Sequence, residues 1–308
     1  MIFSGVISFT SDVWTSDNNL NAFLSLTGHW IDGEWNRRYA FLKLHSLEGP
    51  HTGQLISNNI KTILKEFNIL EDRQGIIVRD NGASMVLAAR LSGLQDLGCF
   101  IHTIQLVVNA GLKPSAQKMV TETISTARSI VGHFRHSTKA TECLKIIQHS
   151  LNTVASPFPQ HRLIQDIRTR WNSTFYMLER LLEQKKAIGL YSQDHDISVL
   201  TSNQWTVVEK LVQLLRPFEE ETRKASASTS TAGIIIPSVR LLTHLLQKPD
   251  ENAQINVIRQ IMLKNLCERY AEVEKNKICV LATTLDPTAK IHFFTNETKQ
   301  IGREWLLE

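Results

Sequence analysis

Hydrophobic and polar positions follow two different periods in the first hundred residues. Residues 2–9, 22–31 and 38–47 are rich in β-branched and aromatic side chains and are bounded by Gly, Asp or Asn, which predicts an antiparallel meander of three strands. Residues 53–67 and 83–91 carry apolar side chains at helical spacing, whereas 75–78 and 97–101 are short apolar runs typical of buried strands. The predicted order is βββαβαβ, an α/β arrangement with helices packed on a mixed sheet.

Beyond residue 103 the strand signals fade and helical periodicity takes over. We expect helices at residues 104–112, 116–133, 140–151, 172–191, 202–226, 236–246 and 253–274. The segment Ser156-Pro157-Phe158-Pro159 separates two of these helices, and residues 225–233 form a linker rich in Ser, Thr and Ala. The pattern therefore predicts two domains, an α/β domain at 1–103 and an all-helical domain at 104–308.

Composition and charge exclude some classes of protein. With 308 residues, 42% of them hydrophobic and 21% charged, the chain has the composition of a folded globular protein. The formal net charge of +4 is too small to indicate nucleic-acid binding by itself. The four cysteines have no framework spacing, which favours a reducing compartment without disulfides. No apolar run is long enough to span a membrane, so we expect no membrane partner.

Two aspartates follow apolar strand-like runs in the first domain. Asp12 lies in SDVWTS, where the first predicted strand ends, and Asp80 lies in VRDNGASM, where a later one ends. Carboxylates at the ends of neighbouring strands can converge, and Mg²⁺ or Mn²⁺ prefers such oxygen ligands for phosphodiester chemistry. A complete site needs at least one further acid. The alternative interpretation is that both aspartates bond to nearby backbone N–H groups as turn residues or helix caps.

Cysteine and histidine pairs suggest a second metal site. Cys99 and His102 have the spacing of half a zinc site, and His133 with His136 has the spacing of another half. Structural zinc sites lie in small, loop-rich units, whereas we place Cys99 in an apolar strand and His133 in a helix. The sequence therefore predicts no zinc in this chain.

A third candidate site is cationic and aromatic. Arg168, Arg170 and Trp171 stand at the entrance to a predicted helix, with Asn172 or Ser173 able to cap it. Two guanidinium groups and an indole can hold a DNA phosphate and stack on an exposed base. The alternative is a hydrophobic Trp171 anchor beside solvent-facing arginines. Further basic residues of the helical part would line one face of it: Arg128, Arg135, Lys139, Lys145 and Arg162.

Several stretches of the chain look like the successive blocks of one family. SDVWTSDNNLNAFLSLTGHWID resembles its first catalytic block, GIIVRDNGASM its second, LGCFIHTIQLVVNAGL its Cys/His block and TRWNSTFYMLERLLE its Arg-Trp block. VEKLVQLLRPFEEETRKAS, GIIIPSV and ATTLDPTAK are similar to segments of its helical insertion domain. The family is the hAT superfamily of DNA transposases, with its domesticated branch of BED-type zinc finger proteins. The resemblance implies a truncated ribonuclease-H-like core, the fold with the βββαβαβ order, and a large helical insertion.

The resemblance also implies roles for individual residues. Asp12 and Asp80 correspond to the first two acids of a D-D-E metal site, Cys99 and His102 to residues beside that site, and Trp171 to an aromatic that stacks on a flipped base. The family's third acid is a glutamate in a Ser-Glu-Arg-like segment, and none follows Leu285-Asp286-Pro287 here. No BED zinc finger occurs either. Further departures are Gly82 and Ser84, where asparagine is usual, and Thr288, where a basic residue is usual.

These features favour a nuclear, transposase-derived protein that associates with double-stranded DNA and has little or no cleavage activity. A two-metal site without its third acid loses a ligand that fixes the metal geometry. One alternative is an active hAT-type transposase fragment that cleaves and joins DNA, with its remaining parts elsewhere. Another is a scaffold whose helical part binds proteins. Homo-oligomers are expected only where the family's C-terminal dimerisation region is present.

Overall fold

The computed structural model describes residues 5–16, 21–113, 118–154 and 156–307. The chain divides into two compact units, Met1–Thr103 and Ile104–Glu308. Helix α3, Phe100–Leu112, begins in the first unit and continues into the second. None of the helices in the described ranges combines the length and apolar character needed to cross a bilayer.

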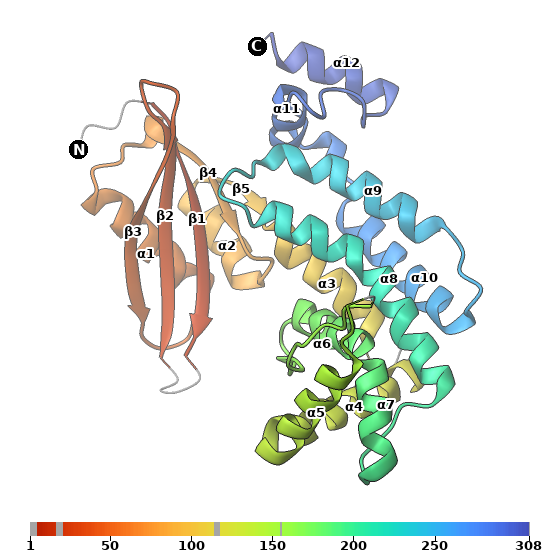
Figure 1. The fold of residues 1–308 in the computed structure, drawn as a ribbon. Helices are drawn as coiled ribbons and strands as arrows, with labels where there is room; N and C mark the ends of the chain where they lie inside the picture. The colour runs from red at the N-terminus through yellow and green to blue at the C-terminus, as the bar shows by residue number, and fades with distance from the viewer. Residues whose placement is uncertain (1–4, 17–20, 114–117, 155, 308) are drawn as a thin grey trace. The chain divides into compact units, whose positions relative to one another are not determined.

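In the described part of the first unit, five strands form a mixed sheet (Figure 1). The strands are β1 (Ile7–Thr15), β2 (Ala22–Ile31), β3 (Arg37–Leu47), β4 (Gln74–Arg79) and β5 (Gln95–Gly98), in the spatial order β3-β2-β1-β4-β5. β2 is antiparallel to both β1 and β3, whereas β4 is parallel to both β1 and β5. Helices α1 (Gly53–Glu66) and α2 (Ala83–Ser92) connect the later strands. This order confirms the predicted α/β fold.

The core of this unit lies between one face of the sheet and the helices α1 and α2, which Figure 1 shows behind the strands. Alternate residues of each strand point to this face. Phe9, Leu24 and Ile77 contribute side chains with no solvent exposure, and Ile60 of α1 packs in the same cluster. The opposite face carries the residues between them, including Thr10 and Asp12, which are exposed. A residue's position along a strand therefore decides whether it packs in the core or is available for chemistry.

Two strands depart most from the sequence prediction, the first and the last. The first strand covers Ile7–Thr15 instead of residues 2–9, of which 2–4 lie outside the described residues. β1 continues past Phe9 because β2 supplies antiparallel partners as far as Thr15. The last strand ends at Gly98 instead of residue 101. Helix α3 starts there because the Cys99 carbonyl accepts the Thr103 N–H at 3.0 Å, the first bond of a helix.

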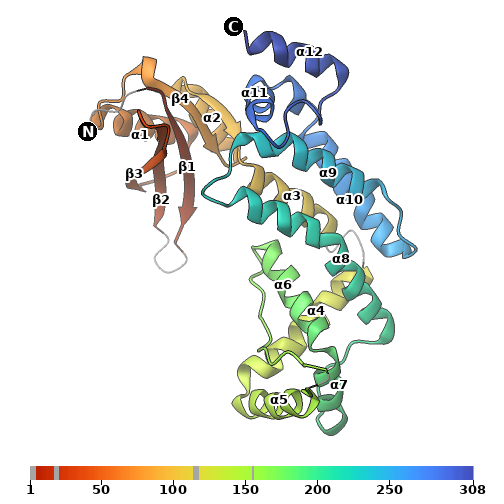
Figure 2. The ribbon, with the colours of Figure 1, turned by 45° about the horizontal axis from the view of Figure 1, so that its top comes forward.

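The second unit is all-helical within the described residues, as predicted. Figure 2 shows α8 passing alongside α6 and α9, which it contacts. The helices that follow α3 are α4 (Lys118–His136), α5 (Thr138–Leu151), α6 (Trp171–Glu183), α7 (Lys185–Asp194), α8 (Ser202–Ala225), α9 (Ile235–Gln247), α10 (Ala253–Arg269), α11 (Lys277–Leu285) and α12 (Asn296–Trp305). Short 3-10 turns cover Glu71–Arg73, Ala232–Ile234 and Val273–Lys275. The turn at Ala232–Ile234 lies at the end of the predicted linker, residues 225–233.

The helix predicted at residues 172–191 is two helices. α6 ends at Glu183 and α7 begins at Lys185. Between them, the fully buried Gln184 donates from Nε2 to the Pro159 carbonyl at 2.8 Å and accepts from Gln148 Nε2 at 2.9 Å. These bonds to distant segments hold the chain at the break. The pattern of apolar residues continues through both helices and does not reveal it.

The C-terminal part also differs from the prediction. α10 ends at Arg269 instead of residue 274, and α11 and α12 were not predicted. Both later helices begin with a side-chain cap. Asn276 accepts the Cys279 N–H at 3.1 Å, and Thr295 accepts the Thr298 N–H at 3.3 Å. Such caps are local signals that mark where the chain resumes a helix.

Candidate functional site

Asp12 lies in β1, and Asp80 comes directly after β4, the parallel neighbour of β1. Thr10 of β1 pairs with Val78 of β4, and each aspartate lies two residues beyond its member of this pair. Because side chains alternate along a strand, Asp12 points to the side of the sheet opposite the core residue Phe9. Asp80 follows β4 directly, as predicted. Asp12 lies inside β1, opposite Ser25 of β2, and not at the strand end as expected.

Asp80 also has the local role of a turn residue. Its Oδ1 accepts the N–H of Gly82 at 2.8 Å, and Gly82 is the N-cap of α2. A Cβ on Gly82 would lie 3.1 Å from this oxygen, so glycine leaves the carboxylate room to approach the backbone. The bond uses Oδ1 and orients the Asp80 carboxylate. Asp80 can therefore bond to the backbone, as the alternative interpretation has it, and still serve as a metal ligand.

Arg79 fixes the backbone around Asp80. Its guanidinium forms an ion pair with Asp96 of β5 and donates to the Asp80 carbonyl at 2.8 Å. The Arg79 carbonyl accepts the N–H of Cys99 at 2.7 Å, which extends the β4–β5 pairing to the start of α3. The sequence analysis did not assign a role to Arg79. The sequence feature that could have identified Arg79 is its position between an apolar strand and the acidic turn residue that follows.

Asn81 is the second residue that the sequence analysis missed. Its Nδ2 donates to Thr103 Oγ1 at 2.8 Å, and that hydroxyl donates to the Cys99 carbonyl at 3.0 Å. A Cβ on Gly98 would lie 2.8 Å from Asn81 Oδ1, so glycine lets β5 pass close to the amide without displacing it. Asn81 thereby links the end of β4 to the first turn of α3.

Cys99 and His102 form a pair at the start of α3. Cys99 lies between β5 and the helix and not in the strand, contrary to expectation. Burial raises the pKa of the Cys99 thiol, but hydrogen bonds from the His102 side chain and from the backbone of His102 and Ile101 outweigh this and lower it. The bond to Cys99 raises the pKa of His102, burial opposes this, and the charges of Cys99, Asp12 and Asp80 add to the increase. His102 thus shares one electrostatic environment with both aspartates.

The donor set suits a hard divalent cation. Asp12 and Asp80 offer carboxylate oxygens, which Mg²⁺ and Mn²⁺ prefer. Within the described residues, no group of three or more His, Cys, Asp or Glu side chains is arranged to hold a metal ion. His133, considered above with His136 as half of a zinc site, bonds through Nε2 to the Tyr191 hydroxyl at 3.0 Å.

The Arg-Trp segment stands at the start of α6, in the helical unit. Trp171 is the first residue of α6, and its indole is 3% exposed, so it anchors the helix in the core and has no open face for a base. Arg168 and Arg170 are exposed, and Asn172 is half-buried. Arg170 occupies the N-cap position without a side-chain cap, where Asn172 or Ser173 was expected. The Trp171 position matches the structural alternative considered for it.

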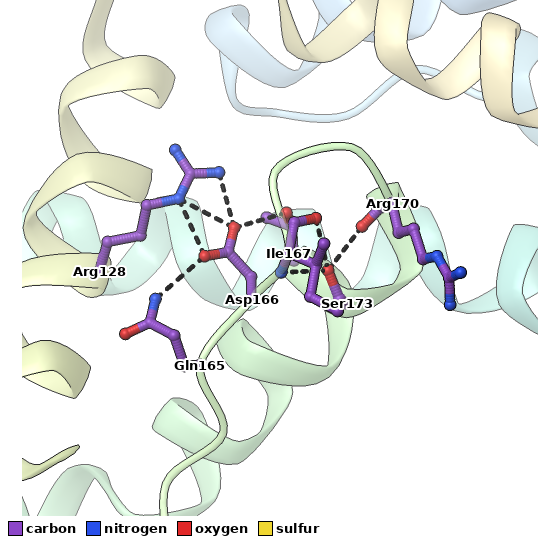
Figure 3. A network of polar contacts seen from close by, with 7 residues as sticks. Arg128, Gln165, Asp166, Ile167, Arg170 and Ser173 are labelled. Atoms are coloured by element: carbon purple, nitrogen blue, oxygen red, sulfur yellow. Dashed lines mark hydrogen bonds and ion pairs between the residues drawn. The ribbon is translucent and has the colours of Figure 1, made fainter. Parts of the chain in front are cut away.

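A polar network holds this segment (Figure 3). Ser173 Oγ accepts the N–H of Ile167 at 2.8 Å and lies 2.6 Å from the Arg170 carbonyl oxygen. Arg128 of α4 donates from Nε and Nη2 to the buried Asp166 carboxylate at 2.7–3.1 Å. Arg128 is therefore neutralised inside the protein. Figure 3 shows the Arg170 guanidinium directed away from this network.

Comparisons with known proteins agree with this architecture. The ZBED1 RNase-like domain matches residues 10–97, and the ZBED1 RNase-like helical domain matches residues 97–214. Human zinc finger BED domain-containing protein 4 is 32% identical over 99% of this chain and 26% of its own length. A putative AC transposase of Zea mays is 26% identical over 92% of this chain and 36% of its own length. This chain therefore spans about a third or less of the length of these curated relatives.

Among solved structures, the strand transfer complex of the Drosophila P element transposase is similar over 98% of this chain and 76% of that chain, with a TM-score of 0.30 and 9% identity. The fold assignment rests on the sheet order and the two domain matches. These matches are adjacent and together cover residues 10–214. The chain belongs to the family of hAT transposases and the BED-type zinc finger proteins derived from them.

Proposed function

We propose that this chain is a transposase-derived, DNA-associated module of a nuclear protein. The observation that supports the proposal is the pairing of Thr10 with Val78 in the parallel strands β1 and β4, because Asp12 and Asp80 each lie two residues beyond this pair. Two carboxylates near neighbouring strand ends repel each other, and a bound divalent cation would offset that repulsion. The relatives named BED zinc finger proteins and the putative transcriptional regulator from Talaromyces stipitatus support the nuclear assignment.

In this proposal Asp12 and Asp80 bind Mg²⁺ or Mn²⁺ beside a DNA phosphate. When bound, such an ion neutralises phosphate charge and polarises the phosphoryl oxygen. Asp80 is held by the Gly82 N–H, and the charges of Asp12 and Asp80 contribute to raising the pKa of His102. Arg79 and Asn81 act as positioning residues, because they hold the backbone on each side of Asp80.

We further propose that these residues bind DNA without cutting it. A two-metal site uses carboxylates from at least three positions to fix both ions, and Asp12 and Asp80 supply two. Two acids are enough to attract a cation but not to fix a pair of them around a scissile phosphate. The expected property of the chain is therefore metal-assisted association with little phosphodiester hydrolysis.

Contacts with the DNA backbone are assigned to Arg168 and Arg170. Both are exposed, and exposed guanidinium groups pair with phosphate oxygens through two parallel hydrogen bonds. Asn172, the second residue of α6, is half-buried and is assigned a secondary contact with the same DNA backbone. Trp171 is not included, because its indole is buried in the helical core.

The test is a binding and nicking assay on a labelled DNA duplex with Mg²⁺ or Mn²⁺. We expect binding that weakens steeply as salt rises, little nicking, and weaker binding for the Arg168→Gln/Arg170→Gln variant. Lys118→Gln/Lys264→Gln is the matched control, because it removes two exposed charges elsewhere in the helical unit. Metal-dependent nicking that disappears in both Asp12→Asn and Asp80→Asn would overturn the inactivity, and absence of duplex binding would overturn the DNA association.

A further inference from the structure

A preformed cavity lies within the helical unit, between α4, α5 and residues 161–167. Its volume is ≈ 530 Å³, within the range of small-ligand pockets. Apolar side chains form part of its lining, and three basic side chains stand among them. The apolar residues used in this argument are Val131, Phe134, Leu144, Leu163 and Ile167, and the basic ones are Arg135, Lys145 and Arg162.

Hydrogen bonds to neighbouring helices hold the wall of the cavity that the 161–167 segment forms. Gln148 of α5 is buried and donates to the His161 carbonyl at 2.9 Å. Arg180 of α6 donates to the Arg162 carbonyl at 2.7 Å. At the other end of the segment, Asp166 is held by Arg128. An irregular segment fixed at three points keeps the cavity open without a ligand, which lowers the entropy cost of binding.

The basic residues around the cavity differ in how far their charge is neutralised. Lys145 pairs with Glu142 at 2.5 Å, and His161, which also lines the cavity, contacts Glu183 at 2.8 Å. In the part of the chain that the structure describes, no acidic group lies within ion-pair distance of Arg135 or Arg162, and both are exposed. The rim therefore presents two uncompensated guanidinium groups beside an apolar floor.

We propose that this cavity binds an acidic amphipathic helix of a partner protein. An apolar anchor of the helix would enter the cavity, and carboxylates on its flank would pair with Arg135 and Arg162 in the two-pronged manner of guanidinium groups. Duplex DNA fits less well, because its backbone presents phosphates and sugars and has no apolar group to fill a concave apolar floor. This function is additional to DNA association and does not depend on it.

The probe is a fluorescein-labelled peptide of about four helical turns, with Leu and Phe on one face and Glu on the other. Fluorescence anisotropy measures its binding to the full chain. We expect Arg135→Glu/Arg162→Glu to weaken binding by about tenfold or more, because it reverses the rim charge. Ile167→Ser should weaken it several-fold, because Ile167 is 54% exposed and lines the cavity without belonging to the core. Thermal melts of each variant verify folding.

The matched control is Arg168→Glu/Arg170→Glu, the same charge reversal on exposed residues that do not line the cavity. It should leave peptide binding within about twofold while weakening duplex binding. The proposal is overturned if the peptide does not bind below about 1 mM, or if replacing its Leu and Phe by Ser leaves affinity unchanged. It is also overturned if Arg135→Glu/Arg162→Glu weakens duplex DNA and not the peptide. Duplex binding is measured separately, so a chain that does not bind DNA can still confirm or overturn the proposed peptide binding.

Discussion

Arg128 of α4 binds both carboxylate oxygens of Asp166, a residue 38 positions further along the chain. The Asp166 side chain is 1% exposed, whereas the Arg128 side chain is 29% exposed. Thr174 Oγ1 donates to the same carboxylate at 2.9 Å, and Gln165 donates at 3.1 Å. The buried charge is therefore fully paired, and this pair ties the segment before α6 to α4.

Removal of the arginine should cost more stability than removal of both charges. Arg128→Met leaves the Asp166 charge buried without its partner, and we expect a loss of about 3–5 kcal/mol in the free energy of unfolding. Arg128→Met/Asp166→Asn removes that charge too and should lose less. Urea unfolding of the full chain, followed by far-UV circular dichroism, measures both. Glu122→Gln is the control, since it breaks the exposed Lys118–Glu122 pair and should change stability by less than about 0.5 kcal/mol.

The same pair predicts a dependence of stability on pH. Burial raises the pKa of Asp166, but the hydrogen bonds and charge of Arg128, with the bond from Thr174, outweigh this and lower it below the ordinary aspartate value. A lowered pKa in the folded state stabilises the fold above the unfolded pKa, and this stabilisation is lost as pH falls through the folded pKa. Wild type should therefore exceed Asp166→Asn by a constant margin above about pH 5, and the margin should shrink below pH 4. A margin independent of pH would contradict the assignment.

Two glycines of the helical unit should respond oppositely to alanine. A Cβ on Gly233 would lie 2.6 Å from the backbone oxygen of Ala282, which cannot move without displacing α11, so Gly233→Ala should cost about 1–3 kcal/mol. Gly132 lies inside α4 with no atom within 4 Å of an added Cβ. Gly132→Ala should therefore stabilise by about 0.5–1 kcal/mol. Thermal denaturation measures the shift in Tm of each variant. Equal shifts in Tm would exclude the close approach of Gly233 to the Ala282 backbone oxygen.

Native thiol reactivity should separate two cysteines. Burial raises the pKa of Cys279 to about 11, so about one thiol in a thousand is ionised at pH 8. Cys267 is exposed. In a thiol–disulfide exchange assay on the folded chain, Cys267→Ser should remove one rapidly reacting thiol. Cys279→Ser should leave the rapid phase unchanged and should remove a reactive thiol only after urea has unfolded the chain. Rapid labelling of Cys279 would show that the packing around it opens.

Local patterns were sufficient for much of the fold. The β-branched and aromatic content of residues 22–31 predicted a strand, and apolar spacing predicted a helix at residues 53–67, because both signals depend on neighbours within a few residues. Asp80 could be placed after its strand for the same reason. The predicted ends of an element were wrong where contacts with a distant segment of the chain set them. β1 extends past Asp12 because of β2, and the break at Gln184 depends on Pro159 and Gln148.

The sequence by itself determined the βββαβαβ order of the first unit, and it supplied the acids, the Cys99–His102 spacing and the basic residues before α6. Only the tertiary structure decided which of them meet. The β1–β4 pairing decides that Asp12 and Asp80 each lie two residues beyond a paired position, packing buries Trp171, and Asp166 neutralises the charge of Arg128. The physical reason is that side-chain period is a local property of the backbone, whereas strand register, burial and ion pairing depend on residues tens of positions apart.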